Sequence, residues 1–371
     1  MLKRKHLLGL FSLLLVGMVG CSQQPAAPAP APAQTETTSS APAATPAATE
    51  SKDPLAPLAN TAKVMIAEDG GASGAGFYIA DKKGYFKEYN IEVEFVTLHN
   101  SGDMLPTLAS GEIDIAGGIA SASFFNALSQ GIDVKMITDK GHNIPGQSYF
   151  NLVIRKDLEG TIKDYKDLKG KKIGLITPNG VDQYILDAAL KHGGLTPADV
   201  EKVVIADPGN ILASLQSKEL DAATQIEPLI TQGVANNILV PLGDTTDFLP
   251  KGQTALVLAS PDFTKDKEVS LRFIAAYLRG VRDYNDAFLK NKGKDEIISI
   301  MTEYTHMKDP AQWQNIRVTG LNANGELHVE DILLQYEYHR NNGGTVGEFD
   351  VNKNIDTSLV EEAVKLIGTY E

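Results

Sequence analysis

Two patterns of apolar residues alternate along the chain from residue 63 onward. Short apolar segments such as 63–67 and 172–176 predict strands, because four to eight such residues suit a buried strand. The longer segments between them, such as 77–83 and 182–192, predict helices. Gly84 follows the first of these and suits a left-handed C-terminal cap. Strand–helix units of this length predict parallel sheets with helices on both faces.

This strand–helix rhythm runs twice and therefore predicts two α/β lobes. The first run has predicted strands at 63–67, 91–95, 113–116 and 134–138, and the second at 172–176, 203–205 and 221–226. A helix is expected at 101–110, with Pro106 in or near its first turn, where proline is tolerated. A further strand at 255–259 is expected to return to the first lobe.

The C-terminal part is mainly helical in this prediction. A long helix there carries an apolar stripe with a spacing of three or four residues: Phe273, Tyr277, Val281, Tyr284 and Phe288. Such a stripe is typical of core packing rather than of a ligand surface. Tyr284, near the end of the stripe, is the one position where both roles stay open.

The N-terminus has the layout of an exported lipoprotein. A basic start at 3–5 is followed by an apolar run at 7–19, which predicts a signal peptide. The run is shorter than the roughly 20 residues that span a bilayer. It ends in Met18-Val19-Gly20-Cys21, which resembles a lipobox. We therefore predict a signal peptide at 1–20 and lipidation of Cys21, the only cysteine, against the alternative of an ordinary thiol in a removed leader.

Residues 21–60 are rich in Ala, Pro, Ser and Thr and have few large apolar side chains. Such a segment buries too little surface to offset the entropy of ordering, so we expect a disordered tether. The formal net charge of the chain is −13. The sequence has no long basic patch, which argues against a nucleic-acid partner, and the acidity favours solubility of a monomer.

Four segments in the predicted order carry a resemblance to a known class. They are 76–87, which contains KGYFK, 167–174, which reads DLKGKKIG, 220–228, and the helix 272–289. In order and spacing they resemble the type II periplasmic binding proteins of the nitrate, sulfonate and thiamine-pyrimidine-precursor class, which are substrate-binding lipoproteins of ABC importers.

The resemblance implies a two-lobed α/β fold in which each lobe has a mostly parallel sheet flanked by helices. It implies that lobe one comprises 61–151 plus 253–371 and lobe two 152–252. The lobes would close on a small molecule by hinge motion and present it to the permease and ATPase subunits of an importer. The implied location is extracytoplasmic, with the lipid as the only anchor to the cell membrane.

Ligands of open parallel sheets bind beyond the carboxyl ends of the strands. Five predicted loops occupy such positions: 69–74, 117–121, 140–143, 177–181 and 225–228. Their glycines allow close backbone approach, and the helix starts offer free N–H donors. The residues that we expect to contact the ligand are Asp69, Gly71, Ser73, Gly118, Ser121, His142, Thr177, Asn179, Gln225 and Glu227.

Several of these positions have a plainer explanation. The loop 69–74 also fits a tight strand–helix turn, and it lacks the lysine of a phosphate-binding P-loop. Ser121 can cap the helix that follows it. His142 can be a surface or packing residue, and Glu227 can be a permease contact or a solvated charge.

The chemistry of the loops narrows the ligand class. They contain no arginine for a bidentate clamp on a carboxylate or phosphate. Their polar groups, together with nearby Phe77, Tyr149 and Tyr184, suit a planar nitrogen heterocycle such as a pyrimidine or vitamin precursor. The alternative is nitrate, an alkanesulfonate or a similar anion held by hydroxyls and helix N-termini.

Two other classes of function compete with the importer receptor. The superfamily also resembles pyrimidine synthases that carry a clustered cysteine motif for iron, whereas this sequence has one cysteine. Its histidines show no metal-ligand spacing, and a Gly-x-Ser-x-Gly elbow is missing. We therefore predict no catalytic residue, no metal site, no cofactor and no enzyme. A sensory receptor that passes its ligand to a signalling protein stays open.

Overall fold

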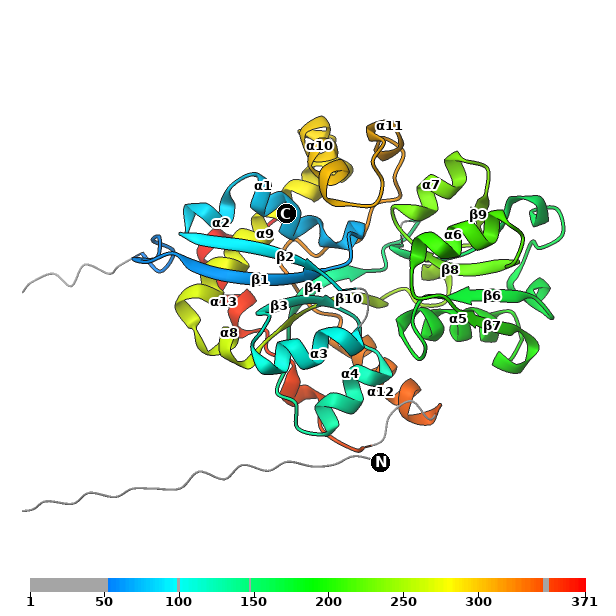
Figure 1. Ribbon diagram of the computed structural model, residues 1–371, viewed down its shortest axis with the longest axis horizontal. Coiled ribbons are helices and arrows are strands. Elements are labelled where there is room, and N and C mark those ends of the chain that lie inside the picture. Colours follow the sequence, from blue (N-terminus) through cyan, green and yellow to red (C-terminus); the bar gives the residue numbers. More distant parts are fainter. Residues whose placement is uncertain (1–52, 99–100, 147, 343–346) are drawn as a thin grey trace, which may run out of the picture. The chain divides into compact units, whose positions relative to one another are not determined.

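The computed structural model describes residues 53–98, 101–146, 148–342 and 347–371, with the side chains of 101–103 excluded. The predicted signal peptide, Cys21 and the predicted tether as far as residue 52 lie outside the described residues. The described chain folds around two five-stranded mixed sheets. Figure 1 shows the sheet of lobe one with the blue and cyan strands and that of lobe two in green.

The sheet of lobe one has the strand order β2-β1-β3-β10-β4. Strand β1 pairs in parallel with both β2 and β3, whereas β10 is antiparallel to both β3 and β4. Four of its strands therefore run in one direction, and the returning strand runs against them. Their bounds are β1 Ala62–Glu68, β2 Ile91–Thr97, β3 Ile115–Gly118, β4 Lys135–His142 and β10 Gln253–Ala259.

The sheet of lobe two repeats this plan with the order β7-β6-β8-β5-β9. Strand β6 is parallel to β7 and β8, and β5 is antiparallel to β8 and β9. The chain enters lobe two through β5 and returns to lobe one through β10. The two mixed sheets confirm the predicted fold class. The bounds are β5 Phe150–Arg155, β6 Lys172–Leu175, β7 Glu201–Val204, β8 Ala222–Ile226 and β9 Leu239–Pro241.

Helices cover both faces of each sheet, as the strand–helix rhythm predicts. In lobe one, α1, α9 and α13 pack with one set of apolar strand residues, and α3, α4 and α12 with the other set. In lobe two, α6 and α7 lie on one face and α5 on the other. The α-helices of the described residues are α1 Ala75–Lys82, α2 Tyr85–Glu88, α3 Ser101–Ser110, α4 Ala122–Ser129, α5 Val181–His192, α6 Pro208–Gln216, α7 Leu229–Ala235, α8 Pro261–Lys265, α9 Lys267–Lys290, α10 Lys294–Tyr304, α11 Pro310–Trp313, α12 Val329–Asn341 and α13 Ser358–Ile367.

The long helix α9 is held against α1 at very short range. A Cβ added at Gly280 would lie 2.2 Å from the carbonyl oxygen of Gly76, so a glycine is needed for this approach. The ring of Tyr277 on the same helix packs against the ring of Phe77 in a tilted geometry, with centroids 4.6 Å apart. Tyr284 is fully buried, and its hydroxyl accepts the Thr319 N–H at 3.2 Å. The apolar stripe of α9 therefore serves the core.

The structure corrects several predicted boundaries. The tether was expected to reach residue 60, but Leu58 donates its N–H to the Tyr89 carbonyl at 3.1 Å, and Arg272 binds the Ala56 carbonyl at 2.6 Å. The segment 53–60 therefore packs on lobe one. Pro106 lies inside α3 rather than in its first turn.

Two strands of lobe one also differ from their predicted positions. Strand β3 begins at Ile115 rather than at residue 113, because the Asp114 carboxylate accepts the Met65 N–H at 2.8 Å instead of extending the ladder. Strand β4 continues to His142, where a loop was expected at 140–143. Its pairing with β10 is interrupted by register irregularities at these residues.

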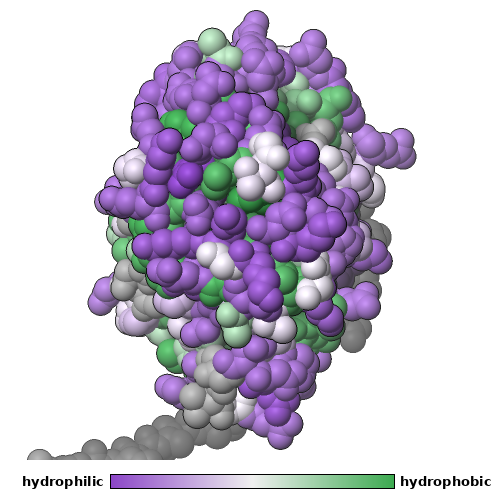
Figure 2. Space-filling model, turned by 90° about the vertical axis from the view of Figure 1, so that its right-hand side faces the viewer, coloured by the Kyte–Doolittle hydropathy of each residue, from purple (hydrophilic) through white to green (hydrophobic). Residues whose placement is uncertain are grey.

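The face of the molecule on the lobe-two side is predominantly hydrophilic, with only scattered hydrophobic residues (Figure 2). Exposed large apolar side chains among the described residues are Val204, Val234, Leu289, Leu334 and Leu366. Within the described part of the chain, no helix combines the length and the apolar character needed to cross a membrane.

Candidate functional site

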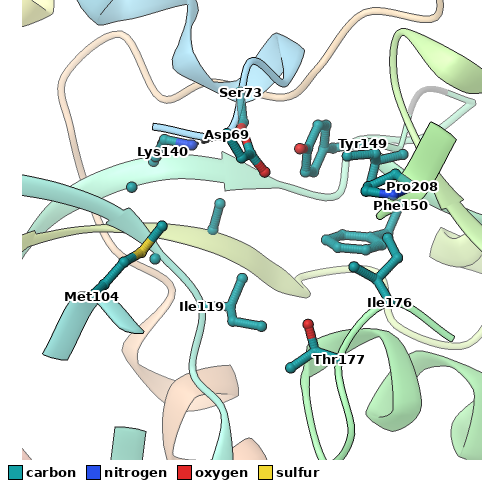
Figure 3. A pocket seen from close by; sticks show the side chains of 14 residues that line it. Asp69, Ser73, Met104, Ile119, Lys140, Tyr149, Phe150, Ile176, Thr177 and Pro208 are labelled. Carbon is teal, nitrogen blue, oxygen red and sulfur yellow. Dashed lines mark hydrogen bonds between the residues drawn. The ribbon is translucent and has the colours of Figure 1, made fainter. Parts of the chain in front are cut away.

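A cavity of about 50 Å³ lies between the two lobes, at the carboxyl ends of their parallel strands. The lobes touch directly around it: the Ala72 N–H donates to the Glu227 carbonyl at 3.3 Å, and the Ala122 N–H to the Asn179 carbonyl at 2.9 Å. The cavity is lined by Asp69, Ser73, Met104, Gly117, Gly118, Ile119, Lys140, Tyr149, Phe150, Ile176, Thr177, Pro208, Ile226 and Ala255 (Figure 3).

One wall of the cavity carries a buried charged network. The Lys140 ammonium donates to Ser73 Oγ at 2.8 Å and lies 3.2 Å from Glu68 Oε1. The hydroxyl of Tyr78 donates to the second oxygen of Glu68 at 3.3 Å. Burial raises the pKa of Glu68 to about 7, although the neighbouring Lys140 acts in the opposite direction. Ser73 and Lys140 line the cavity, whereas Glu68 lies behind them.

Asp69 supplies a carboxylate to the same wall. Its Oδ1 accepts the Gly71 N–H at 2.9 Å, which fixes the turn after β1, and its carbonyl oxygen contacts His306 Nε2 at 2.6 Å. In Figure 3 the Tyr149 hydroxyl points toward the Asp69 carboxylate, and the two groups lie near each other. The pKa of Tyr149 lies well above its ordinary value, mainly because the residue is buried and secondly because Asp69 is negatively charged. The Tyr149 hydroxyl therefore remains protonated.

The other walls are apolar and come from both lobes. Phe150 packs edge-on against Tyr149, with ring centroids 5.1 Å apart and an interplanar angle of 83°. Figure 3 shows Ile119 from lobe one and Ile176 from lobe two on the side of the cavity away from Asp69. The cavity thus combines an apolar body with a small polar wall, which suits a small organic ligand.

Four of the predicted ligand-contacting residues line the cavity: Asp69, Ser73, Gly118 and Thr177. Gly71 lies outside the lining but beside it, since a Cβ at this position would be 2.5 Å from the Tyr149 hydroxyl. Four of these five lie in the segments that follow β1 and β6, and Gly118 is the last residue of β3. Their contact with a ligand stays a prediction.

The other five predicted residues are held by different contacts and do not line the cavity. Ser121 caps α4 by accepting the Phe124 N–H at 3.2 Å, and the backbone oxygen of Asn179 joins the lobes. His142 Nδ1 lies 3.3 Å from the Asp139 carboxylate within strand β4, so its expected loop position is corrected.

Gln225 and Glu227 are satisfied within lobe two. The Gln225 amide donates to the Pro208 carbonyl at 2.9 Å, and its oxygen accepts the Ile226 N–H at 2.9 Å. The Glu227 carboxylate accepts from the N–H and the hydroxyl of Thr231, both at 3.1 Å. Glu227 is fully buried, which excludes the alternative of a solvated surface charge.

The sequence-based prediction placed Lys140 and Tyr149 near the ligand without naming either as a contact, and it missed Phe150. Lys140 was expected in a loop, but it lies near the end of β4. Tyr149 and Phe150 stand where the chain crosses into lobe two, and only the first was noted as a ring that could stack. A lysine next to the carboxyl end of a predicted strand is the signal that could have identified Lys140.

A second buried carboxylate supports the lobe-two side of the site. Asp182 Oδ2 accepts the N–H groups of Ile176 and Thr177 at 2.7 and 3.1 Å, which orders the loop before α5. Burial raises the pKa of Asp182 to about 6. Within the described ranges, no group of three or more His, Cys, Asp or Glu residues is placed to hold a metal ion.

A family model described as NMT1/THI5 like matches residues 72–286, which is more than half of the 371-residue chain. One curated relative, 4-amino-5-hydroxymethyl-2-methylpyrimidine phosphate synthase of Aspergillus parasiticus, is 27% identical over 161 residues, or 41% of this chain and 42% of the relative. A putative binding protein of Brucella abortus strain 2308 is 26% identical over 213 residues, 56% of this chain and 62% of the relative. The chain spans less than two thirds of the length of these relatives.

Solved structures with low sequence identity share the fold over most of their length. The alkanesulfonate-binding protein SsuA of Xanthomonas axonopodis pv. citri, bound to MOPS, gives a TM-score of 0.65 at 15% identity, covering 81% of this chain and all (100%) of that one. The periplasmic nitrate-binding protein NrtA of Synechocystis PCC 6803 gives 0.66 at 14%, covering 82% and 89%.

A ligand-binding component of an ABC-type import system from Staphylococcus aureus, with zinc bound, gives a TM-score of 0.66 at 16% identity, covering 81% of this chain and 98% of that one. At these low sequence identities, the similarity to the solved structures shows a shared fold. The match to the family model shows a relationship in sequence. The chain therefore belongs to the NMT1/THI5-like family and has the type II periplasmic binding protein fold.

Proposed function

We propose that this protein is an extracytoplasmic solute receptor that binds a small molecule between its lobes and delivers it to an ABC importer. The proposal is supported by the interlobe cavity and by the importer component of Staphylococcus aureus that shares the fold. A cavity of about 50 Å³ holds a few water molecules at most. A ring-sized ligand therefore requires the lobes to move apart and close again around it.

The ligand that we propose is a planar nitrogen heterocycle, such as a pyrimidine or a vitamin precursor. The observation that carries this choice is the charge on the cavity wall. Lys140 is already paired with Glu68, so the remaining charged group of the lining is the Asp69 carboxylate. A carboxylate accepts hydrogen bonds from ring or exocyclic amines, whereas it repels an anion.

The aromatic wall fits the same ligand class. Tyr149 and Phe150 both line the cavity, with their rings nearly perpendicular to each other (Figure 3), and a flat heterocycle can pack on a ring face or a ring edge. Contacts between aromatic rings contribute about 0.5–1.5 kcal/mol beyond the burial of area. The named product of the Aspergillus parasiticus relative is itself an aminopyrimidine phosphate.

Nitrate or an alkanesulfonate is the alternative ligand class. The observation that favours it is Lys140, whose ammonium lines the cavity. Calorimetry decides between the classes, with 4-amino-5-hydroxymethyl-2-methylpyrimidine, a flavin, nitrate and methanesulfonate titrated into the same preparation. Binding of the pyrimidine without a response to the anions supports the proposal. Tight binding of an anion alone would replace it with the alternative.

A substitution localises the binding to the cavity. Asp69→Asn removes the carboxylate but preserves its size, and we expect it to weaken pyrimidine binding by roughly tenfold or more, because a charged acceptor is lost. Asp262→Asn is the matched control. It neutralises an exposed carboxylate on α8 that does not line the cavity, and it should leave the affinity unchanged. Equal effects of the two substitutions would argue against the site.

An enzymatic role is the remaining rival, because curated relatives are named as synthases. We propose binding without turnover. Incubation of the purified protein with the pyrimidine probes, followed by mass spectrometry, tests this proposal. A new product that forms in proportion to protein concentration would make the chain an enzyme.

A further inference from the structure

A buried ion pair stands directly behind the polar wall of the cavity. Glu68 is the last residue of β1, Lys140 belongs to β4, and both side chains are 3% exposed. Charges removed from water in this way are tolerated when they are paired and hydrogen-bonded. Ser73 and Tyr78 supply the additional hydrogen bonds, one to each partner.

The absence of a side chain at Gly117 leaves the space that this ion pair occupies. A Cβ at Gly117 would lie 2.1 Å from Glu68 Oε1 and 2.3 Å from Lys140 Cε, so any larger residue would displace one of them. Gly117 lies in β3, between β1 and β10 in the sheet. The pair therefore fills the space at the end of β3 that a side chain would otherwise occupy.

The two partners have different access to the cavity. Lys140 lines the cavity and Glu68 does not. A ligand can therefore contact the Lys140 ammonium directly, whereas Glu68 affects the ligand through its effect on Lys140. The Lys140 ammonium donates a hydrogen bond to Ser73 Oγ, whereas Glu68 Oε1 lies beside it as a counter-charge without accepting a hydrogen bond. An ammonium has three N–H donors, so donors remain for an acceptor atom of a ligand. The positive charge that would attract an anion is offset by a carboxylate 3.2 Å away.

Resting on the receptor function proposed above, we infer that Glu68 is a specificity-determining residue that makes the cavity reject anions. With Glu68 in place, Lys140 acts as a hydrogen-bond donor without net charge toward the ligand. If Glu68 were neutral, Lys140 would lose the carboxylate 3.2 Å away and, although Asp69 also lines the cavity, would attract an anion more strongly. The same fold can thus serve neutral or anionic solutes through one residue behind the site.

The test is Glu68→Gln in the full chain, with nitrate, methanesulfonate and 4-amino-5-hydroxymethyl-2-methylpyrimidine as probes. We expect the affinity for one or both anions to rise about tenfold or more, because a charge at about 3 Å is removed. Glu219→Gln, which removes the same charge from an exposed carboxylate that does not line the cavity, is the matched control. It should leave anion affinity unchanged. A folded Glu68→Gln variant without gain, or an equal gain in Glu219→Gln, overturns the inference.

If Glu68→Gln fails to fold, a pH titration of the wild-type protein compares ionised with protonated Glu68 without a substitution. The groups that face Glu68 are Lys140, Asp69 and the hydroxyls of Tyr78, Tyr149 and Tyr277. Burial holds the pKa of the three hydroxyls well above their ordinary value, so they stay protonated. Burial places the pKa of Glu68 at about 7.

Anion affinity of the wild type should therefore rise as the pH falls from about 8.5 to about 5.5, because protonation of Glu68 removes the negative charge beside Lys140. Lys140→Met should abolish the rise, and an identical rise in that variant overturns the inference. Wild-type binding of the pyrimidine reports on the proposed function separately. A gain of anion binding without any pyrimidine binding would support the role of Glu68 and reject the heterocycle.

Discussion

The hydroxyl of Tyr184 on helix α5 of lobe two donates to the Asp331 carboxylate on helix α12 of lobe one at 3.1 Å. The second oxygen of Asp331 is held within lobe one, by the Gln253 N–H at 2.8 Å and the Gln335 amide at 2.7 Å. Lobe one thus orients one carboxylate oxygen toward lobe two. A second link between the same helices joins the Tyr338 hydroxyl to Asp187. These bonds tie the lobes together in the observed arrangement.

Tyr184→Phe removes the hydroxyl that reaches Asp331 and should shift the lobes toward an open arrangement. We expect ligand affinity to fall roughly three- to tenfold, since a hydrogen bond of this kind contributes about 0.5–1.5 kcal/mol. Calorimetry with the pyrimidine probe measures the loss, and small-angle scattering measures the accompanying increase in radius of gyration.

Tyr304→Phe is the control for this prediction. It deletes a comparable bond to a carboxylate, from the Tyr304 hydroxyl to Asp81 at 2.6 Å, but both residues belong to lobe one. It should leave affinity and radius unchanged. If both variants lose affinity equally, the bond between Tyr184 and Asp331 has no particular role in closure.

Gly280→Ala should destabilise lobe one. Its new methyl group would lie 2.2 Å from the Gly76 carbonyl oxygen, so the backbone of α1 or α9 would have to shift. Overpacking of this kind costs about 1–3 kcal/mol of the free energy of unfolding. Gly160→Ala is the control, since no atom lies within 4 Å of its added Cβ. Urea unfolding of the two variants measures the difference, and equal midpoints would contradict the tight contact between α1 and α9.

Most of the fold could be predicted because the apolar pattern and the burial coincide. Residues 63–67 were expected as a strand, and β1 extends only slightly beyond them, with Ile66 and Ala67 facing different cores. The rule that ligands bind at the carboxyl ends of strands likewise led to Asp69 and Ser73, which directly follow β1.

The rest of the site depends on contacts between distant segments, which a linear pattern does not contain. Lys140 reaches the cavity because β4 runs on past residue 138, and its partner Glu68 is 72 positions earlier in the chain. Gln225 has the polar side chain expected of a ligand contact, yet the neighbouring Pro208 carbonyl satisfies it. Local sequence shows which groups are polar, but not which of them are already paired.

Cys21→Ser should release the protein from the cell membrane. The prediction follows from the expected signal peptide at 1–20 and from Cys21 as the only cysteine of the sequence. Cell fractionation and immunoblotting measure it: the parent is expected in the membrane fraction and the variant in the soluble extracytoplasmic fraction. A variant that stays as membrane-bound as the parent would show that Cys21 is not the anchor.

Ionisation of Glu227 should lower the free energy of unfolding as the pH rises. It is fully buried, and burial raises its pKa from 4.5 to about 7, against the opposing effect of the hydrogen bonds from Thr231. The folded state therefore binds this proton more tightly than the unfolded state does. The resulting stabilisation is fully present below about pH 4.5 and is lost as the pH rises through about 7.

Glu227→Gln keeps the size and the neutral charge of the protonated residue but removes its titration. Between about pH 5 and pH 8, we expect the free energy of unfolding of the variant to decline by about 1–3 kcal/mol less than that of the wild type. Urea unfolding at constant ionic strength measures both slopes. Glu219→Gln, at an exposed carboxylate, should keep the wild-type slope.

Other groups titrate in the same range, but they are common to all three proteins. Burial raises the pKa of Glu68 to about 7 and of Asp182 to about 6, and both add to the decline. Burial lowers the pKa of His339 to about 4, which opposes the decline below about pH 6.5. Because these contributions cancel between variants, the difference in slope belongs to Glu227. Parallel slopes for wild type and Glu227→Gln would mean that this carboxyl is already ionised in the folded protein at pH 5.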